Sequence, residues 1–341
     1  MKIDSVTIKI LREIALGETK IKRISEKIKV PRTTIIARLQ RMFEKGGLTV
    51  RAAISYYELG LQPVVVFSDM DPYSWGIPYI AYTAKIVSYN GVKYLTLLTL
   101  PLKHLNKYLE RIGENCIFKT YDPVTWIPDD TYAKIEGGKI KTDWLKMCKS
   151  ARADQLCLPH TPRVKVKLDQ IDLYTLEKLQ QNSLEKLKRI ADGLGIHPNL
   201  LLYHYHKHIQ PLLLGSRVDF NFWDWKEAPL ELYLFKASNF KDLQKILSIF
   251  RKSLNFKTAF IEVDRHQAIT ILQIPSWEKL DFMNALLMMR KRGLRKVMFL
   301  GLVDPSSSKY HVLPLKYFGK RGWLYAKIPK YRFKGRFNYE S

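Results

Sequence analysis

Apolar residues near the start of the chain recur at the spacing of amphipathic helices and then at that of a strand. Helices are predicted at residues 6–15, 20–28 and 33–44, and a strand at residues 48–56. Pro31 lies just before the third helix and Gly46-Gly47 ends it, as is typical of residues that start and stop helices. Three helices with a short connection before the third, followed by a strand, predict a winged helix-turn-helix domain over residues 1–60.

After this domain the pattern changes to short runs rich in β-branched and aromatic residues. Strands are predicted at residues 64–69, 80–89, 93–100 and 116–121. Asn90-Gly91 is a hairpin turn between the two middle strands. Residues 102–112 have the period of a helix, and a shorter helix is expected near residues 74–79. The order βαββαβ predicts a ferredoxin-like sandwich over residues 61–122.

The second half of the chain follows the same order of elements. Its predicted helices are 173–181, 184–194, 199–208, 240–254 and 277–292, and its predicted strands are 230–237, 258–263, 268–274 and 296–303. The segment Lys20–Ile24 also returns as Lys186–Ile190 with one residue changed. The repeated order of elements, together with this repeated segment, predicts a second winged-helix-like domain over residues 166–225 and a second ferredoxin-like domain over residues 226–315. The fold class is therefore α+β, a tandem duplication of a winged helix-turn-helix followed by a βαββαβ domain.

Two segments do not fit the repeat. Residues 123–165 are irregular and polar, and are predicted to be a linker between the halves with some order of its own. Residues 316–341 form a basic aromatic C-terminal segment, in which eight lysines and arginines stand against one acid, Glu340. Cations interleaved with aromatic rings are typical of a nucleic-acid groove or tail. A terminal strand pair with buried aromatic residues explains the same pattern, and the sequence does not choose between the two.

Charge narrows the function classes. The chain has 341 residues, with 57 Lys+Arg against 32 Asp+Glu, a net charge of +25 and 46% hydrophobic residues. The apolar fraction excludes wholesale disorder, and no apolar run approaches the roughly 18 residues that span a bilayer. No signal-peptide pattern opens the chain, and three cysteines are too few for a disulfide scaffold, so a cytoplasmic protein without a membrane partner is expected. The positive excess favours a polyanion, double-stranded DNA, as partner.

The first winged helix carries the strongest candidate DNA contacts. Residues 1–52 hold 13 Lys+Arg against 5 Asp+Glu. The third helix is expected to turn four apolar residues inward, namely Ile35, Ile36, Leu39 and Met42. Its outward residues would enter the major groove, and cations on the second helix and the wing would contact phosphates. The predicted contacts are Lys20, Lys22, Arg23, Arg32, Thr33, Thr34, Arg38, Arg41, Lys45 and Arg51.

The second winged helix has fewer cations and a more apolar third helix. Its candidate DNA contacts are Lys186, Lys188, Arg189, Asn199, His204 and Lys207. Asparagine reads adenine well, but Leu200-Leu201-Leu202 is unusual at the front of a recognition helix. The sequence leaves open whether this domain binds DNA more weakly or contacts a protein.

No catalytic, cofactor or metal site is predicted. His204 and His208 are four residues apart and share a helix face, but no acidic or cysteine partner lies nearby in the sequence. Structural or DNA-contacting histidines are therefore favoured. Cys148, Cys157 and His160 match no common zinc spacing, and neither a phosphate-binding loop nor a nucleophile elbow occurs.

At two places the chain resembles the Lrp/AsnC family of prokaryotic transcription regulators. Residues 168–176, LDQIDLYTL, resemble that family's opening helix, and residues 57–61, YELGL, resemble its junction between wing and effector domain. The resemblance implies a sequence-specific DNA-binding regulator that is not an enzyme. In the family the ferredoxin-like domains pair and often bind small effectors, but no residue of this chain is assigned to an effector. Family members normally carry one unit per chain and form homodimers or larger oligomers. Here two units in one chain would pair as an intrachain pseudo-dimer.

Two alternative functions remain open. Some siroheme decarboxylases look like Lrp/AsnC proteins, and a basic cleft with histidines suits a tetrapyrrole with several carboxylates. A protein that binds nucleic acid through charge alone, without sequence preference, is the other alternative.

Overall fold

The structure, a computed structural model, describes residues 3–112, 117–136, 139–150, 156, 167–319 and 322–326. Its helices are α1 (Ser5–Ala15), α2 (Ile21–Ile28), α3 (Arg32–Gly46), α4 (Leu105–Ile112), α5 (Trp144–Ser150), α6 (Gln170–Gln181), α7 (Leu187–Leu194), α8 (Pro198–His204), α9 (Phe240–Phe250) and α10 (Lys279–Arg290). In the part of the chain that the structure describes, none of the helices has the length and apolar character needed to cross a bilayer.

The strands divide between a large sheet and three short pairs. They are β1 (Thr49–Ile54), β2 (Leu61–Ser68), β3 (Ile80–Ser88), β4 (Gly91–Pro101), β5 (Ile117–Lys119), β6 (Val124–Thr125), β7 (Ala133–Glu136), β8 (Lys139–Thr142), β9 (Leu213–Asp219), β10 (Leu230–Ala237), β11 (Phe256–Ile261), β12 (Gln267–Gln273), β13 (Leu294–Val303), β14 (Lys309–Tyr310), β15 (Phe318–Gly319) and β16 (Gly322–Trp323). The structure is therefore a mixed α+β fold, as predicted.

Helices α1–α3 form where the apolar periodicity predicts them. Asp4 caps α1 by accepting a hydrogen bond from the Thr7 N–H at 3.0 Å, and α2 ends at Lys29, whose φ of 56° is left-handed. The prediction that Ile36 faces inward is wrong, because its side chain is 49% exposed. Ile35 and Leu39 already fill the narrow buried stripe of α3, so the neighbouring position faces solvent.

The large sheet is antiparallel, with strand order β5-β2-β4-β3-β13-β10-β12-β11-β6, and β14 adds to β3. Counted within each half of the chain, both sets of four strands run in the order fourth, first, third, second. This order fits a βαββαβ connection. In the first half, the helix predicted near residues 74–79 is only a 3-10 turn at Pro72–Trp75, whereas α9 is a full helix at the corresponding place in the second half.

Residues 117–125 connect the two ends of this strand order. β5 pairs with β2, with Phe118 opposite Val65, and β6 pairs with β11, with Thr125 opposite Thr258. One continuous segment thus supplies both outermost strands, β5 and β6, and so links the two edges of the sheet. Apolar side chains from both halves of the sheet form one core cluster, which includes Val65, Phe67, Leu97, Leu232, Phe260 and Ile271.

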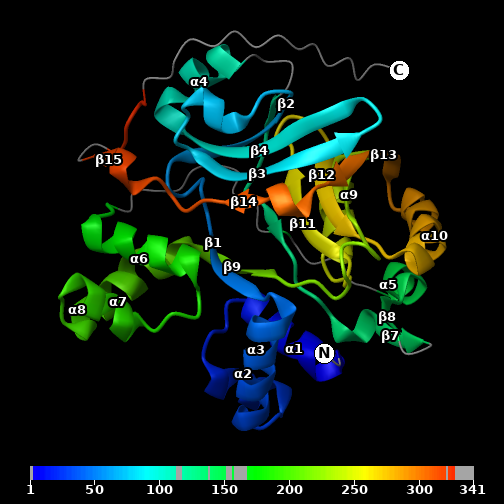
Figure 1. The fold of residues 1–341 in the computed structure, drawn as a ribbon, viewed down its shortest axis with the longest axis horizontal. Helices are drawn as coiled ribbons and strands as arrows, with labels where there is room; N and C mark the ends of the chain where they lie inside the picture. Colours follow the sequence, from blue (N-terminus) through cyan, green and yellow to red (C-terminus); the bar gives the residue numbers. More distant parts are fainter. Residues whose placement is uncertain are drawn as a thin grey trace.

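A separate two-stranded ribbon joins the two groups of three helices. β1 and β9 are antiparallel, with Val50 opposite Val218 and Ala52 opposite Ser216. In Figure 1 the ribbon runs below β14, between helices α6–α8 and helices α1–α3. The α1 helix packs so closely on β9 that a side chain at Gly215 would lie 2.6 Å from the Ala15 carbonyl oxygen. Gly215 also has a φ of +122°, so this contact requires glycine.

Each three-helix group shares its core with the half of the sheet that is distant from it in sequence. Side chains of α1 and α3, such as Ile14 and Leu39, belong to one cluster with Phe235 and Leu247 of the second half. Side chains of α6–α8, such as Leu176, belong to another cluster with β2, β4 and α4. The halves of the chain are therefore interlocked through their cores.

The described part of residues 123–165, predicted as a linker with some order of its own, is ordered and packs into the core of the second half. Trp126 and Trp144 are buried, and their indole N–H groups donate to the Ser253 carbonyl oxygen and to Glu278. The α5 helix packs against α9 and α10 through Trp144, and the Ile140 carbonyl oxygen of β8 accepts a hydrogen bond from the Trp223 indole N–H. These elements are too short to produce a clear periodicity, which is why the sequence reads as irregular.

We predict that stability depends on pH through Glu278. Burial raises the pKa of Glu278 to about 7, against hydrogen bonds from Trp144 and the Thr142 N–H that favour its ionised form. Because folding disfavours ionisation, its cost is absent below pH 4.5, grows as pH rises towards 7 and is complete above 7. Glu278→Gln should remove this pH dependence, which is on the order of 2–4 kcal/mol between pH 5 and pH 8.

Urea unfolding of the wild type, Glu278→Gln and Glu44→Gln at pH 5 and pH 8 measures this. The wild type should lose more stability than Glu278→Gln between the two pH values, and the exposed Glu44→Gln should behave as the wild type. Parallel pH profiles for all three proteins would contradict the prediction.

Candidate functional site

Two arginines face each other at the centre of the molecule. Arg51 on β1 and Arg217 on β9 are directly paired in the antiparallel register, so their side chains leave the ribbon on the same face. Both guanidinium groups lie over the ring of Tyr310, at 4.5 Å and 4.4 Å from its centroid. Tyr310 is on β14, the strand above the ribbon in Figure 1. We refer to Arg51, Arg217, Asp219, Tyr82 and Tyr310 as the arginine–tyrosine cluster.

The charges of this cluster do not balance. Arg51 Nη1 lies 2.9 Å from Asp219 Oδ2, and Arg217 Nε lies 3.5 Å from Asp219 Oδ1. Two guanidinium groups therefore share one carboxylate, which leaves a net positive charge at a largely buried place. The side chains of Arg51 and Arg217 are 26% and 19% exposed, so solvent still reaches them. A partly exposed, undercompensated cation pair is suited to bind a carboxylate.

Tyrosine hydroxyl groups surround the arginines. Arg217 Nη2 donates to the Tyr310 hydroxyl at 2.8 Å, and the Tyr82 hydroxyl lies 3.2 Å from Ser308 Oγ. Burial raises the pKa of Tyr82 and of Tyr310, and raises that of nearby Tyr56 to about 12. These phenols therefore keep their protons at neutral pH and can donate hydrogen bonds or protons.

Two further groups close to the cluster titrate near neutral pH. Burial lowers the pKa of Lys257 to about 8, and its Nζ donates to the Phe220 carbonyl oxygen, one residue beyond Asp219. Burial raises the pKa of Asp122 to about 6, while this carboxylate accepts hydrogen bonds from Ser55 Oγ and the Tyr56 N–H. Buried groups with pKa values near 7 are typical of acid–base sites, although structural networks produce them too.

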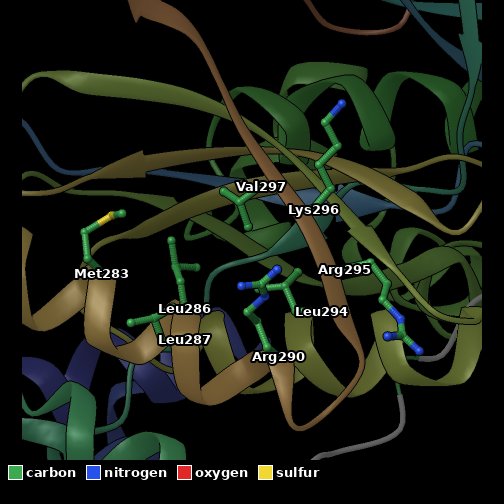
Figure 2. A pocket seen from close by; sticks show the side chains of 8 residues that line it. All are labelled: Met283, Leu286, Leu287, Arg290, Leu294, Arg295, Lys296 and Val297. Carbon is green, nitrogen blue, oxygen red and sulfur yellow. The ribbon is translucent and has the colours of Figure 1, made fainter. Parts of the chain in front are cut away.

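A second feature, a surface hollow of about 360 Å³, lies between α10 and β13 (Figure 2). It is lined by Met283, Leu286, Leu287, Arg290, Leu294, Arg295, Lys296 and Val297. Figure 2 shows the Arg290 guanidinium between Leu286 and Leu294, while Lys296 extends away from α10. The charged groups of this lining are arginine and lysine alone, so it offers cations and apolar surface but no carboxylate, phenol or imidazole. The arginine–tyrosine cluster is therefore the better candidate for chemistry.

Most of the predicted DNA contacts are on the surface. The exposed residues are Lys20, Lys22, Arg23, Arg32, Thr33, Arg41, Lys45, Lys186, Lys188, Arg189, Asn199 and Lys207, and Thr34 is half-buried. On α3, however, the exposed face also carries Ile36 and Phe43, at 49% and 41% exposure. On α8, Leu200, Leu202 and Tyr203 are exposed, so the outer surface of that helix is largely apolar. DNA contact through these residues stays a prediction.

Three of the predicted contacts are already bound to other side chains of the protein. Arg38 is bound to Asp4 by two hydrogen bonds, of 2.6 Å and 2.8 Å, because α3 crosses the first turn of α1. Arg51 turns toward the arginine–tyrosine cluster. His204 is only 7% exposed and contacts the buried Asp172, because the buried stripe of α8 is Leu201 and His204.

The basic aromatic C-terminal segment is described as far as residue 326. Trp323 packs at 4.9 Å from the ring of Phe318, and its indole N–H donates to the Leu59 carbonyl oxygen. Tyr325 stacks at 5.0 Å from Tyr108 of α4. This part is a short strand pair with packed aromatic rings, the plainer of the two interpretations. Residues 327–341 lie outside the described residues, as do Cys157 and His160.

Most of the arginine–tyrosine cluster was not predictable as a site from its spacing. Tyr82, the Arg217–Asp219 pair of β9 and Tyr310 lie far apart in the sequence and meet only through the ribbon, β3 and β14. One signal was present: if the second half repeats the first, a strand must follow its third helix, as β9 does. That strand would have placed Arg217 in the position that Arg51 has in the first half.

Comparisons with known proteins show a likeness of fold without a likeness of sequence. No protein-family model matches the chain, and a search of curated proteins finds no significant match. The crystal structure of the siroheme decarboxylase NirDL superposes with a TM-score of 0.51 at 9% identity, over 93% of this chain and 96% of that one. The likeness is one of fold.

Two regulators give shorter and weaker matches. E. coli AsnC matches with a TM-score of 0.30 and 15% identity, over 40% of this chain and 92% of that chain. The leucine response regulatory protein LrpA of Mycobacterium tuberculosis matches with a TM-score of 0.23 and 17% identity, over 32% of this chain and 83% of that chain. The structural neighbours thus include Lrp/AsnC regulators, each matched over less than half of this chain.

The expectation that the chain is not an enzyme is wrong. It rested on the inference that this architecture means a regulator, but the solved structure that shares the fold over 93% of the chain is that of an enzyme. Fold alone does not decide function, so the chemistry of the site has to.

We predict that Arg38 contributes to stability rather than to base recognition. Arg38→Ala should lower the free energy of unfolding by about 1 kcal/mol, because it removes a bidentate but partly exposed ion pair. Asp4→Asn keeps the side-chain oxygen that caps α1, so a double-mutant cycle of the two substitutions isolates the pair. A coupling energy near zero, measured by urea unfolding, would contradict this prediction.

Proposed function

We propose that this protein is an enzyme that decarboxylates a tetrapyrrole bearing several carboxylate side chains. The observation that carries the proposal is the Arg51–Arg217 pair, which presents two cations against one carboxylate in a partly buried place. The fold shared with a siroheme decarboxylase supports the class of substrate. The net charge of +25 also favours an anionic ligand.

The arginines would hold carboxylates that do not react. A guanidinium stabilises the charged carboxylate strongly, so a carboxylate held in this way is protected from losing carbon dioxide. A substrate with several carboxylates can use some of them as anchors while another reacts. The Tyr310 ring beneath both guanidinium groups fixes their orientation, so that little ordering is needed when the substrate binds.

The tyrosines would supply the proton. In a decarboxylation the bond between the carboxyl carbon and its neighbour breaks, carbon dioxide leaves, and the neighbour takes up a proton in its place. Burial raises the pKa of Tyr310, so its hydroxyl keeps the proton until a stronger base, the developing carbanion, accepts it. Water then returns a proton to the phenolate. Arg217, which donates to the same hydroxyl, would stabilise the phenolate in the meantime.

We also infer that the chain is a tandem duplication whose halves pair as an intrachain pseudo-dimer. The equal strand orders of the two halves and the opposite placement of Arg51 and Arg217 support this inference. Paired strands from two equivalent units give one site at their junction, with one arginine from each. The two sides of the site differ, because Asp219 and Tyr310 come from the second half of the chain only.

We predict that removing either arginine weakens binding of a carboxylated tetrapyrrole. Arg51→Gln and Arg217→Lys should each raise the dissociation constant of siroheme about tenfold or more, because each loses charge-assisted or bidentate hydrogen bonds. Absorbance titration of the full chain measures the binding. Mass spectrometry of the products, after incubation without oxygen, reports the loss of carbon dioxide.

Arg23→Ala, an exposed cation on α2, is the matched control and should bind as the wild type does. Thermal unfolding of each variant shows whether it is folded. Equal affinities in the wild type, Arg51→Gln and Arg217→Lys, with all three folded, would reject the site. Binding without any loss of carbon dioxide would reject the reaction.

DNA binding is a second candidate function on a different surface. Arg32, Arg41 and Lys45 are exposed along α3, and Lys20, Lys22 and Arg23 are exposed along or just before α2. Cations on these two helices fit the phosphates on either side of a major groove. Exposed Ile36 and Phe43 on the same helix weaken the case for a deep fit to base edges. We therefore propose charge-driven contact with the DNA backbone here.

We predict that Arg32→Ala combined with Arg41→Ala weakens binding to a random-sequence duplex. The salt slope of the binding constant should become smaller by about one for each phosphate contact that is lost. Fluorescence anisotropy at several salt concentrations measures both effects. Arg290→Ala combined with Lys291→Ala, at the end and the C-cap of α10, removes the same charge elsewhere and should change the slope less. Equal slopes for both double variants would contradict the prediction, because the lower net charge alone would then explain the weaker binding.

A further inference from the structure

Asp172, His204 and His208 meet inside the second three-helix group, at a place that the proposed reaction does not use. Asp172 lies in the first turn of α6 and is fully buried, His204 ends α8, and His208 follows in a π-helical turn at Tyr205–Ile209. His204 Nδ1 lies 2.9 Å from Asp172 Oδ1, and His208 Nδ1 lies 3.0 Å from Asp172 Oδ2. One atom from each residue lies within 4.8 Å of the other two.

The buried carboxylate of Asp172 needs a positive partner. A buried, ionised carboxylate is costly unless a charge and hydrogen bonds compensate it. Within the described part of the chain, the ion pairs of Asp172 are with His204 and His208 and with no lysine or arginine. Its other recorded contact is the hydrogen bond that Oδ2 accepts from the Asp169 N–H in the capping box of α6. A cation held between the carboxylate and the two imidazoles would be such a compensating charge.

The geometry of the three groups fits a small metal ion. Both imidazoles present the same nitrogen, Nδ1, to the carboxylate. Ligand atoms at the corners of a tetrahedron around zinc, with bonds of about 2.0–2.1 Å, lie roughly 3.3 Å apart. The Asp–His distances of 2.9 and 3.0 Å are close to this value, so small side-chain movements open the space for an ion. Two histidines and one carboxylate form a ligand set that zinc commonly accepts.

Local structure orients the ligands and leaves one side open. The π-helical turn changes the helical phase between His204 and His208, and such turns are frequent at functional sites. Tyr203 packs against both imidazole rings, at 5.8 Å and 6.0 Å between centroids. His208 is 24% exposed, and Asp169 Oδ2 lies 3.7 Å from His204 Nδ1 on the solvent side. Asp169 or a water molecule can therefore complete the coordination.

We propose that Asp172, His204 and His208 bind a divalent transition-metal ion, with zinc as the best match. The ion would tie the first turn of α6 to the end of α8 and so fix the packing of the second three-helix group. From the sequence, the histidine pair lacks an acidic partner. The fold supplies one from a helix that begins 30 residues or so earlier in the chain.

The test uses the full chain after EDTA treatment, with zinc or cobalt chloride as the added metal. We expect one strongly bound zinc per chain at this site and a higher Tm with zinc. Cobalt should give the visible absorption bands of a tetrahedral or five-coordinate site with nitrogen and oxygen ligands. His208→Ala and Asp172→Asn should weaken binding at this site by about 100-fold or more, since even groups that only support metal ligands contribute 10–100-fold.

His206→Ala is the matched control, because His206 is exposed on the same turn and contacts Gln210 instead. It should leave the cobalt spectrum and the zinc affinity unchanged. Asp172→Asn keeps a hydrogen-bond acceptor for one histidine, so a folded Asp172→Asn protein separates lost metal binding from lost folding. Absence of the cobalt bands in the wild type, or wild-type metal affinity in folded His208→Ala or Asp172→Asn, would overturn the proposal.

Discussion

The pairing of β1 with β9 is the constraint on which the rest of the structure depends. These strands come from opposite halves of the chain, and each directly follows a three-helix group. Their antiparallel register places Arg51 against Arg217 and brings α1 onto β9, where Gly215 allows the Ala15 carbonyl to approach. A shift of one residue would turn one arginine to the opposite face, because side chains alternate along a strand. The ribbon therefore fixes both the interlocking of the halves and the geometry of the candidate site.

Local patterns predicted much of the secondary structure, because helices and hairpins are encoded within short windows. The α3 helix is bounded by Pro31 and Gly47 as expected, and Asn90-Gly91 joins β3 to β4. The β9 strand was missed, since Gly215 interrupts its short alternating pattern. The joining of the sheet ends through residues 117–125 was also missed. Both features depend on pairing between distant segments, and local periodicity does not show which distant segments pair.

Side-chain roles were predicted less well than elements, for a related reason. A cation on an amphipathic helix looks the same in the sequence whether it faces DNA or a carboxylate on a neighbouring helix. Arg38 has the position of a base-reading residue but meets Asp4, and His204 has the position of a contact residue but meets Asp172. In each case the acidic partner lies more than 30 residues away. Only the packing of the helices shows which outward-facing side chains are bound to a carboxylate of a neighbouring helix.

The charges decide how far the fold can be taken as a guide to function. The enzyme structure that shares this fold is only 9% identical to the chain, so the shared fold does not by itself select a function. The exposed cations of α2 and α3 are solvated, so long-range attraction to a polyanion costs them little desolvation. Arg51 and Arg217 are largely buried, share one carboxylate and face phenols that keep their protons. Holding two cations there is costly unless an anion compensates them, and a carboxylated ligand supplies such an anion.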